Sequence, residues 1–138
     1  MVVRLMYLVD TNVWLEVLLD QQHAGEARDF LQTIEADEIA VSEFTLYSIG
    51  IILTRLKKIS VFLEFISEVL DESRIVCIRL DAARLREVAG VATELRLDFD
   101  DAYQYVSASS SGCTLISFDS DFDRTPLGRK TPAQALAR

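Results

Sequence analysis

Short runs of consecutive apolar residues alternate along the chain with longer stretches in which apolar residues recur every three or four positions. The short runs have the length of buried strands, and the longer stretches have the period of amphipathic helices. The pattern predicts four strands, at about residues 4–9, 38–41, 75–78 and 113–118. It predicts helices at about residues 12–20, 24–35, 43–57, 60–71, 81–96 and 98–111, with a short helix or turn near 131–134.

Residues at the boundaries of these helices support the assignment. Asp98 precedes a predicted helix, where its side chain is suited to accept a hydrogen bond from a free N–H group. Gly112 follows the end of that helix, a position commonly occupied by a residue in the left-handed conformation. Thr131 is followed by Pro132 and, three residues on, by Gln134, which is typical of a capping box.

Strands that are separated by helices predict right-handed crossovers and a parallel sheet covered on both faces. The sequence therefore indicates an α/β protein with a parallel sheet of about four strands. No repeat, low-complexity tract or flexible linker interrupts the 138 residues, so we expect a single domain over 1–138. Ligands of such sheets bind beyond the carboxyl ends of the strands, which is where candidate chemistry is sought.

Composition excludes several classes of protein. Half of the residues are hydrophobic and only two are proline, which is not typical of a disordered chain. No apolar run reaches the roughly 18 residues that a membrane span requires, and the N-terminus lacks the pattern of a signal peptide. Cys77 and Cys113 fall within predicted strands, where we expect them to be reduced core residues of a cytoplasmic protein.

The formal net charge of −8 bears on possible partners. Proteins that hold nucleic acid by charge alone are usually basic. The acidity therefore argues against a passive DNA- or RNA-binding module. Any contact with nucleic acid would have to be local, or a bound cation would have to neutralise part of the acid.

Acidic residues recur at the carboxyl edge of the predicted sheet. Asp10 follows the first strand, Glu43 the second, and Asp119 and Asp121 the fourth, while Asp101 lies in the first turn of the helix before the fourth strand. Each acid alone has a structural explanation, since Asp favours turns and helix starts, and Asp10 alone is well explained as a helix cap. Their recurrence at one edge of an otherwise apolar fold favours a shared site.

Such a cluster has an electrostatic consequence. Carboxylates within a few ångströms of one another repel, and some must take up protons unless a cation neutralises them. A site built only of oxygen ligands, without His or Cys, suits Mg²⁺ or Mn²⁺ better than Zn²⁺. We therefore expect a divalent-cation site at this edge.

Three segments resemble the PIN-domain ribonucleases, which include the VapC toxins of toxin–antitoxin pairs: LVDTNVWLEVLL, DDAYQYVSA and ISFDSDF. The resemblance extends to the TPAQAL tail and implies a three-layer α/β/α fold with metal-dependent cleavage of RNA phosphodiester bonds. It also implies a frequent homodimer and, for the toxins, an antitoxin protein as partner. By matching motifs, Asp10, Asp101 and Asp119 take the places of the family's metal-binding acids, and Asp121 that of an auxiliary acid.

One position departs from the family pattern. The family's second acid lies inside the helix after the second strand, at the position that Ser48 occupies here. Glu43 is the nearest acid, and five residues separate the two side chains by roughly 140° around a helix. Glu43 is therefore a candidate catalytic acid, but it cannot reproduce the usual geometry. An equal explanation is that Glu43 has no catalytic role and is favourable in the first turn because its charge complements the helix dipole.

Two other functions remain open. A degenerate family member could bind RNA or a protein without cleavage, and the serine at position 48 motivates this alternative. A receiver-type phosphoacceptor or phosphatase also gathers acids at strand ends, but it needs a lysine after a late strand, and Lys130 has no predicted strand before it.

The apolar residues of helices 43–57 and 60–71 occupy more than one face, which independently predicts a dimer.

Overall fold

Four short strands form one parallel sheet within residues 5–137, the part of the chain that the computed structural model describes. The strand order is β3-β2-β1-β4, so that β1 lies inside the sheet with neighbours on both sides. The predicted parallel sheet is confirmed, and residue 4 of the first predicted strand lies outside the described residues. The strands are β1 (Met6–Val9), β2 (Ile39–Ser42), β3 (Val76–Ile78) and β4 (Cys113–Ile116).

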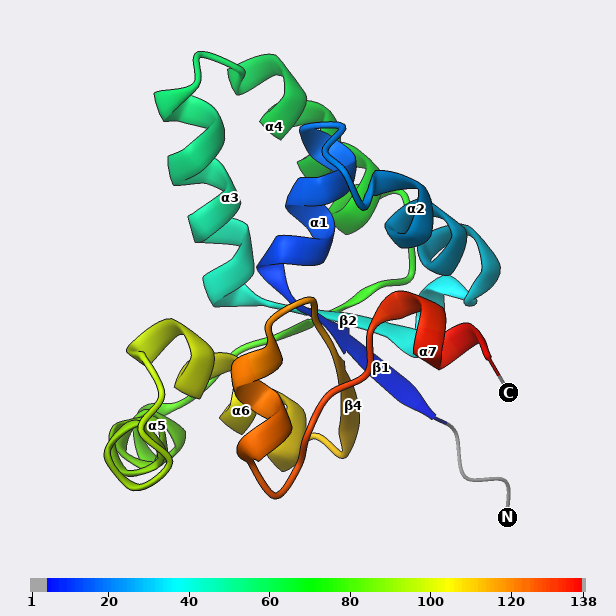
Figure 1. Cartoon of the computed structure of the whole chain (residues 1–138). Helices are drawn as coiled ribbons and strands as arrows, with labels where there is room; N and C mark the ends of the chain where they lie inside the picture. The colour runs from blue at the N-terminus through cyan, green and yellow to red at the C-terminus, as the bar shows by residue number, and fades with distance from the viewer. Residues whose placement is uncertain (1–4, 138) are drawn as a thin grey trace.

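Helices cover both faces of this sheet, which confirms the three-layer α/β/α architecture (Figure 1). One layer contains α1 (Thr11–Leu18), α2 (Ala24–Thr33), α3 (Glu43–Arg55), α4 (Ile59–Ile66) and α7 (Pro132–Leu136). The other layer contains α5 (Ala82–Glu94), α6 (Phe99–Ser110) and the 3₁₀ turn η3 (Ser120–Arg124). Two short segments, η1 (Ala36–Glu38) and η2 (Ser67–Asp71), precede β2 and β3 respectively.

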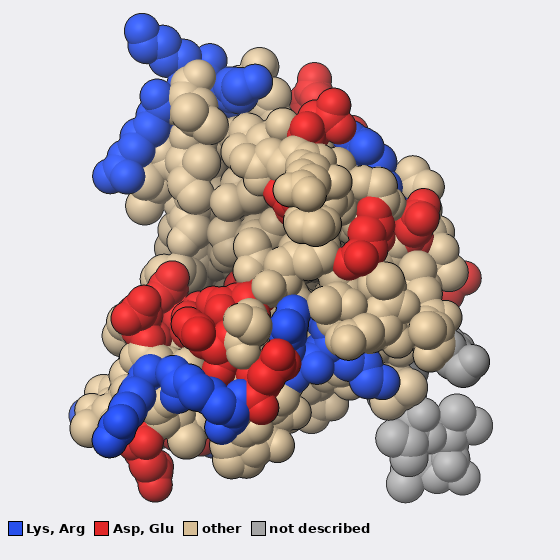
Figure 2. Space-filling view, viewed as in Figure 1, with Lys and Arg blue, Asp and Glu red and all other residues tan. Residues whose placement is uncertain are grey.

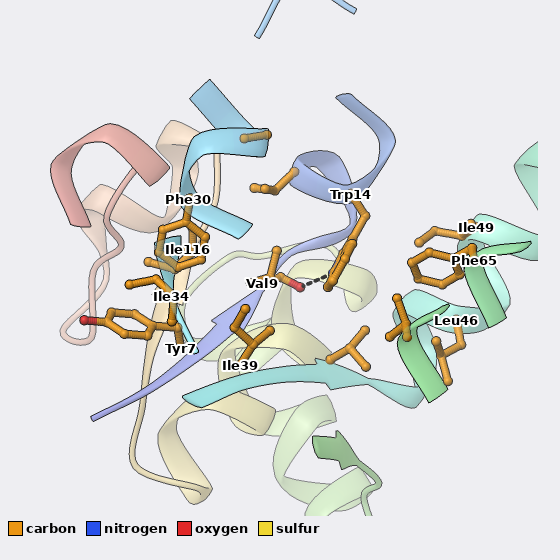
Figure 3. Packing of buried hydrophobic residues seen from close by; sticks show 14 of the residues in the cluster. Tyr7, Val9, Trp14, Phe30, Ile34, Ile39, Leu46, Ile49, Phe65 and Ile116 are labelled. Carbon is orange, nitrogen blue, oxygen red and sulfur yellow. Dashed lines mark hydrogen bonds between the residues drawn. The ribbon is translucent and has the colours of Figure 1, made fainter. Parts of the chain in front are cut away.

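The two hydrophobic cores follow from the alternation of side chains along the strands. Tyr7 and Val9 point into the core beneath α1 and α2, whereas Leu8 points into the core beneath α6. In the first core, Tyr7 meets Phe30 edge-to-face with ring centroids 5.5 Å apart. The indole N–H of Trp14 donates a hydrogen bond of 3.2 Å to the carbonyl of Val9 (Figure 3). Because β1 is buried on both faces, the residue that follows it is held in a fixed place.

Several predicted helices are longer than the observed ones. The helices predicted to end at residues 20, 57 and 96 stop earlier, because Asp20, Lys57 and Arg96 adopt positive φ angles of 51°, 59° and 54°. This left-handed conformation ends helices even where the residue is not glycine. The predicted helix 60–71 is an α-helix only to Ile66 and continues as one π-helical segment to Asp71.

The capping predictions are confirmed in two of three cases. Gly112 has a φ of 68° after α6, and Thr131 and Gln134 form both bonds of the capping box at the start of α7. Asp98 precedes α6, but within the described chain its side chain makes no capping hydrogen bond. The first turn of α6 also contains Asp100 and Asp101, whose charges suit the helix dipole.

Both cysteines are free, as expected from the sequence: Cys113 is buried and Cys77 is partly exposed. They lie in β4 and β3, where they pack with the second and the first core respectively. Among the described residues, no helix has the length and apolar character that crossing a membrane would require.

Candidate active site

A cavity of about 250 Å³ lies at the carboxyl edge of the sheet, next to the end of β1. From β1 the chain continues to β2 on one side of the sheet, whereas β4 lies on the other side of β1. Crevices that bind ligands form where the strand order of a parallel sheet reverses in this way. In Figure 2 acidic atoms gather beneath α3, at the rim of a hollow in the surface. The acidic residues that line the cavity are Asp10, Asp100, Asp101 and Asp119.

Asp10 is the most buried of these acids, with only 5% of its surface exposed. Its Oδ1 accepts hydrogen bonds from the backbone N–H of Thr11 at 2.8 Å and from Nε2 of Gln104 at 2.9 Å. Its Oδ2 accepts from the hydroxyl of Ser117 at 2.7 Å and, more weakly, from Nδ2 of Asn12 at 3.4 Å. Asp10 therefore does cap α1, but the cap is one of four interactions, and three of the donors are side chains.

Opposing effects act on the pKa of Asp10. Burial disfavours the charged carboxylate and is the largest effect, so the pKa is raised overall. The hydrogen bonds from Gln104, Ser117 and Thr11 favour the charged form and lower the pKa, while the charge of nearby Asp119 raises it further. The hydrogen bonds thus offset part of the cost of burying this charge.

Asp101, Asp119 and Asp121 form a tighter group. One carboxylate oxygen from each lies within 4.8 Å of those of the other two. Asp119 follows β4 and caps η3, its Oδ1 accepting from the backbone N–H of Asp121 at 2.9 Å. Asp101 reaches the same place from the first turn of α6. The structure thus brings together three acids that are separated by up to twenty residues in the sequence.

Asp101 shows the electrostatic cost of this arrangement. Burial, followed by the charges of Asp119, Asp100 and Asp10, raises its pKa to about 7. A hydrogen bond with Asp119 raises the pKa further, because only the protonated form of Asp101 can donate to the other carboxyl group. A divalent cation would relieve the same repulsion without protonation.

A second triplet adjoins the first, since Asp98, Asp100 and Asp101 also place carboxylate oxygens within 4.8 Å of one another. Asp101 belongs to both triplets, whereas Asp10 belongs to neither. All these ligands are oxygens, a donor set that fits a hard cation such as Mg²⁺ or Mn²⁺. The residues placed to hold such an ion are therefore Asp101, Asp119 and Asp121, with Asp10 beside them.

The structure separates Glu43 from this group. Glu43 is the first residue of α3, and its Oε2 forms an ion pair of 2.8 Å with Nε of Arg79. It also interacts with the hydroxyl of Tyr47, whose pKa its charge raises. Among the described residues that line the cavity, α3 contributes Ser48 and not Glu43. The placement of Glu43 thus gives no support to its predicted catalytic role.

Sequence reasoning missed the neutral polar residues that surround Asp10. Ser117, which lies at the end of β4, donates to Asp10 and also accepts from the backbone N–H of Asp119 at 2.9 Å. Asn12 donates to Ser117 and accepts from the backbone N–H of Phe118. The sequence holds a signal for Ser117, which is a polar residue inside the apolar run predicted as strand 113–118, but none for Asn12, which starts a predicted helix.

Comparison with known proteins identifies the family. The family model of the PIN domain matches residues 7–127. The chain belongs to the PIN domain family. A comparison with curated protein sequences found no match.

Solved structures share the fold of this PIN domain. A toxin–antitoxin complex from Klebsiella pneumoniae is 20% identical, with 91% of this chain and 97% of that chain covered and a TM-score of 0.73. The Mycobacterium tuberculosis toxin VapC20, described as cleaving the sarcin–ricin loop, is 17% identical, covers 87% and 95%, and has a TM-score of 0.75. FitAcB from Neisseria gonorrhoeae is 22% identical, covers 93% and 99%, and has a TM-score of 0.72. At these identities the similarity shows a common fold.

The raised pKa of Asp101 predicts how stability depends on pH in metal-free protein. Because its folded-state pKa of about 7 exceeds the ordinary value of 3.8 that we assume for the unfolded chain, the folded state binds the extra proton. The resulting stabilisation is fully present below about pH 4 and is lost as the pH rises through 7. Denaturant unfolding in EDTA between pH 4.5 and 8 should show a smaller loss of stability in Asp101→Asn than in the wild type. Parallel curves for the two proteins would contradict the assignment.

Proposed function

We propose that the PIN domain is a Mg²⁺- or Mn²⁺-dependent endoribonuclease that hydrolyses RNA phosphodiester bonds. The observation that supports this most is the convergence of Asp101, Asp119 and Asp121 beside the buried Asp10, at the rim of an open cavity. When bound there, a divalent cation would stabilise charge on the phosphodiester and lower the pKa of an attacking water. The membership of the chain in the PIN domain family agrees with this chemistry.

The protein residues have separate tasks in this proposal. Asp10, Asp101 and Asp119, which all line the cavity, would supply the carboxylates that hold the cation. Asp121 acts as an auxiliary acid at the exposed side of the group. Since the pKa of Asp101 is raised to about 7, cation binding would displace its proton, and activity should therefore increase between pH 6 and 8.

RNA contact by so acidic a protein requires local basic groups. Arg55, Lys57 and Lys58 are all exposed and lie where α3 ends, at the top left of Figure 2, where the view shows Lys and Arg together. Salt-dependent contact with phosphates is the expected role of such a group. The acids lie in the cavity, which Ser48 and Ile52 of α3 also line. Phosphate contact at the end of α3 and cleavage in the cavity would therefore involve different parts of the surface.

A toxin–antitoxin assignment is part of the proposal. Two of the solved structures with this fold are a toxin–antitoxin complex and a toxin described as cleaving the sarcin–ricin loop. We propose an antitoxin protein as a partner of this chain and a cytoplasmic location, which its reduced cysteines also favour.

Removal of Asp119 tests the proposed activity. We expect Asp119→Asn to abolish cleavage of a mixed RNA pool in Mn²⁺ and to weaken Mn²⁺ binding in calorimetry by at least about tenfold. Asp29→Asn, which removes an exposed acid on α2, is the matched control and should behave as the wild type. Cleavage that persists in EDTA, or that survives Asp119→Asn, would refute the proposal.

Ser48 motivates a second candidate, a PIN domain that binds RNA or protein without cleavage. A serine hydroxyl on the cavity wall is neutral and too short to replace a carboxylate ligand, and Glu43 is engaged by Arg79. If the missing acid limits an otherwise competent site, Ser48→Glu should increase RNA cleavage in Mg²⁺. Glu43→Gln should change cleavage less than threefold, because Glu43 does not line the cavity. Loss of cleavage in Glu43→Gln together with a decrease in Ser48→Glu would show that Glu43 performs the second acid's role.

The outer surface of α3 and α4 supports the predicted homodimer. Tyr47, Ile51 and Leu63 are each more than half exposed, and a shallow apolar groove lies along α3 beside Phe62. Exposed apolar patches of this kind mark interaction surfaces. Light scattering at micromolar concentration should give the mass of a dimer for the wild type and of a monomer for Ile51→Glu. Leu85→Glu, at an exposed leucine of α5, is the control, and a monomeric wild type would contradict the prediction.

A further inference from the structure

Gln104 is the most deeply buried polar residue of α6 that contacts an acid of the cavity, with 2% of its surface exposed. Its side chain lies where three elements meet: the end of β1, the start of α3 and the middle of α6. It bonds Asp10 from β1, Ser42 at the end of β2, and Thr45 in the first turn of α3. A long amide in an otherwise apolar core is costly unless every polar atom is satisfied.

The hydrogen bonds of Gln104 fix which way its amide points. Ser42 donates its hydroxyl proton to Oε1 of Gln104, while its oxygen accepts from the backbone N–H of Thr45 at 3.1 Å. Nε2 then donates one proton to Oδ1 of Asp10 and the other to Oγ1 of Thr45, each at 2.9 Å. Asp10 as a carboxylate can only accept, so the opposite amide orientation would set two acceptors against each other.

Thr45 completes the network on the side of the cavity. It is fully buried, and its Oγ1 lies 2.9 Å from Oγ1 of Thr11, which lines the cavity. The orientation of Gln104 is therefore determined from both ends of its amide. A side chain held in this way cannot rotate without breaking bonds in β2 and α3.

The position of Gln104 on α6 connects two acids of the cavity. Asp101 lies three residues before Gln104, so both side chains project from the same face of the helix. Asp101 joins the group of Asp119 and Asp121, and Gln104 reaches beneath it to Asp10. One helix thus sets the place of Asp101 and, through Gln104, the orientation of the Asp10 carboxylate.

We propose that Gln104 is a positioning residue that orients Asp10 toward the divalent cation, and that its amide is required for tight cation binding. This assignment rests on the proposed function, because it concerns the same site. Bonds from outside the ligand set orient the ligands of metal sites, and their loss typically weakens metal binding by about 10- to 100-fold. If Gln104 had only a structural role, its substitution would lower stability and leave cation affinity unchanged.

The test compares Mn²⁺ affinity with stability in matched variants. Gln104→Met keeps the length of the side chain but removes all three bonds, and it should weaken Mn²⁺ binding in calorimetry by at least about tenfold. RNA cleavage by this variant should recover at saturating Mn²⁺ with an unchanged KM for RNA. Ser107→Ala is the control, since Ser107 is also fully buried on α6 but, within residues 5–137, its hydroxyl bonds only the carbonyl of Tyr103. It should lower the Tm and leave Mn²⁺ affinity unchanged.

Each outcome has a defined meaning. If Gln104→Met has a lower Tm but binds Mn²⁺ as the wild type does, Gln104 is structural and the assignment is overturned. If Gln104→Met does not fold, Gln104→Asn supplies the same comparison, because it keeps an amide that is too short to reach both Asp10 and Ser42. If the wild type itself binds no Mn²⁺, the proposed function fails and this assignment fails with it. Equal Mn²⁺ binding by the wild type and Gln104→Met would instead overturn only the assignment of Gln104.

Discussion

The carboxylate of Asp10 is buried at the end of the central strand, and the arrangement of the cavity depends on how its charge is accommodated there. Removing a carboxylate from water is costly unless hydrogen bonds replace the lost hydration. Those bonds come from α1, from α6 and from the end of β4, through Thr11, Gln104 and Ser117. Each donor lies on a different element, so the charge is satisfied only when the sheet and both helical layers are assembled. The site around Asp10 therefore forms only when the whole fold forms.

The acids near Asp10 have the opposite character, because they are exposed enough to be charged but too close to be charged together. Asp101 is the clearest example, since the charges of three neighbouring acids add to burial in raising its pKa to about 7. In metal-free protein a proton on Asp101 relieves part of this repulsion, and a cation would relieve more of it. The group of acids is therefore less stable without a cation than it would be with one bound. Such a cost is expected where residues are arranged for binding more than for stability.

The sequence predicted the features that periodicity and local chemistry determine. Short apolar runs located the four strands. Of the acids expected at one edge of the sheet, Asp101 and Asp119 lie together, whereas Glu43 pairs with Arg79. Helix ends were less predictable, because Lys57 and Arg96 adopt a left-handed conformation that no local signal distinguishes. The network around Gln104 depends on contacts between residues as far apart as 94 positions, and these become evident only from the assembled structure.

The distribution of charge around the cavity gives the serine at position 48 a physical meaning. The acids that line the cavity come from α6 and from the ends of β1 and β4, whereas α1 and α3 contribute Leu15, Ile52 and Ser48. An acid in place of Ser48 would strengthen cation binding, but it would also add negative charge to a cavity that a phosphate would have to approach. With serine there, a phosphate would be repelled less, and a bound cation would lack a carboxylate from α3. Under the proposed function, lower affinity for the cation would accompany easier access for the substrate, and the hydrogen bonds that orient Asp10 would matter more for holding the ion.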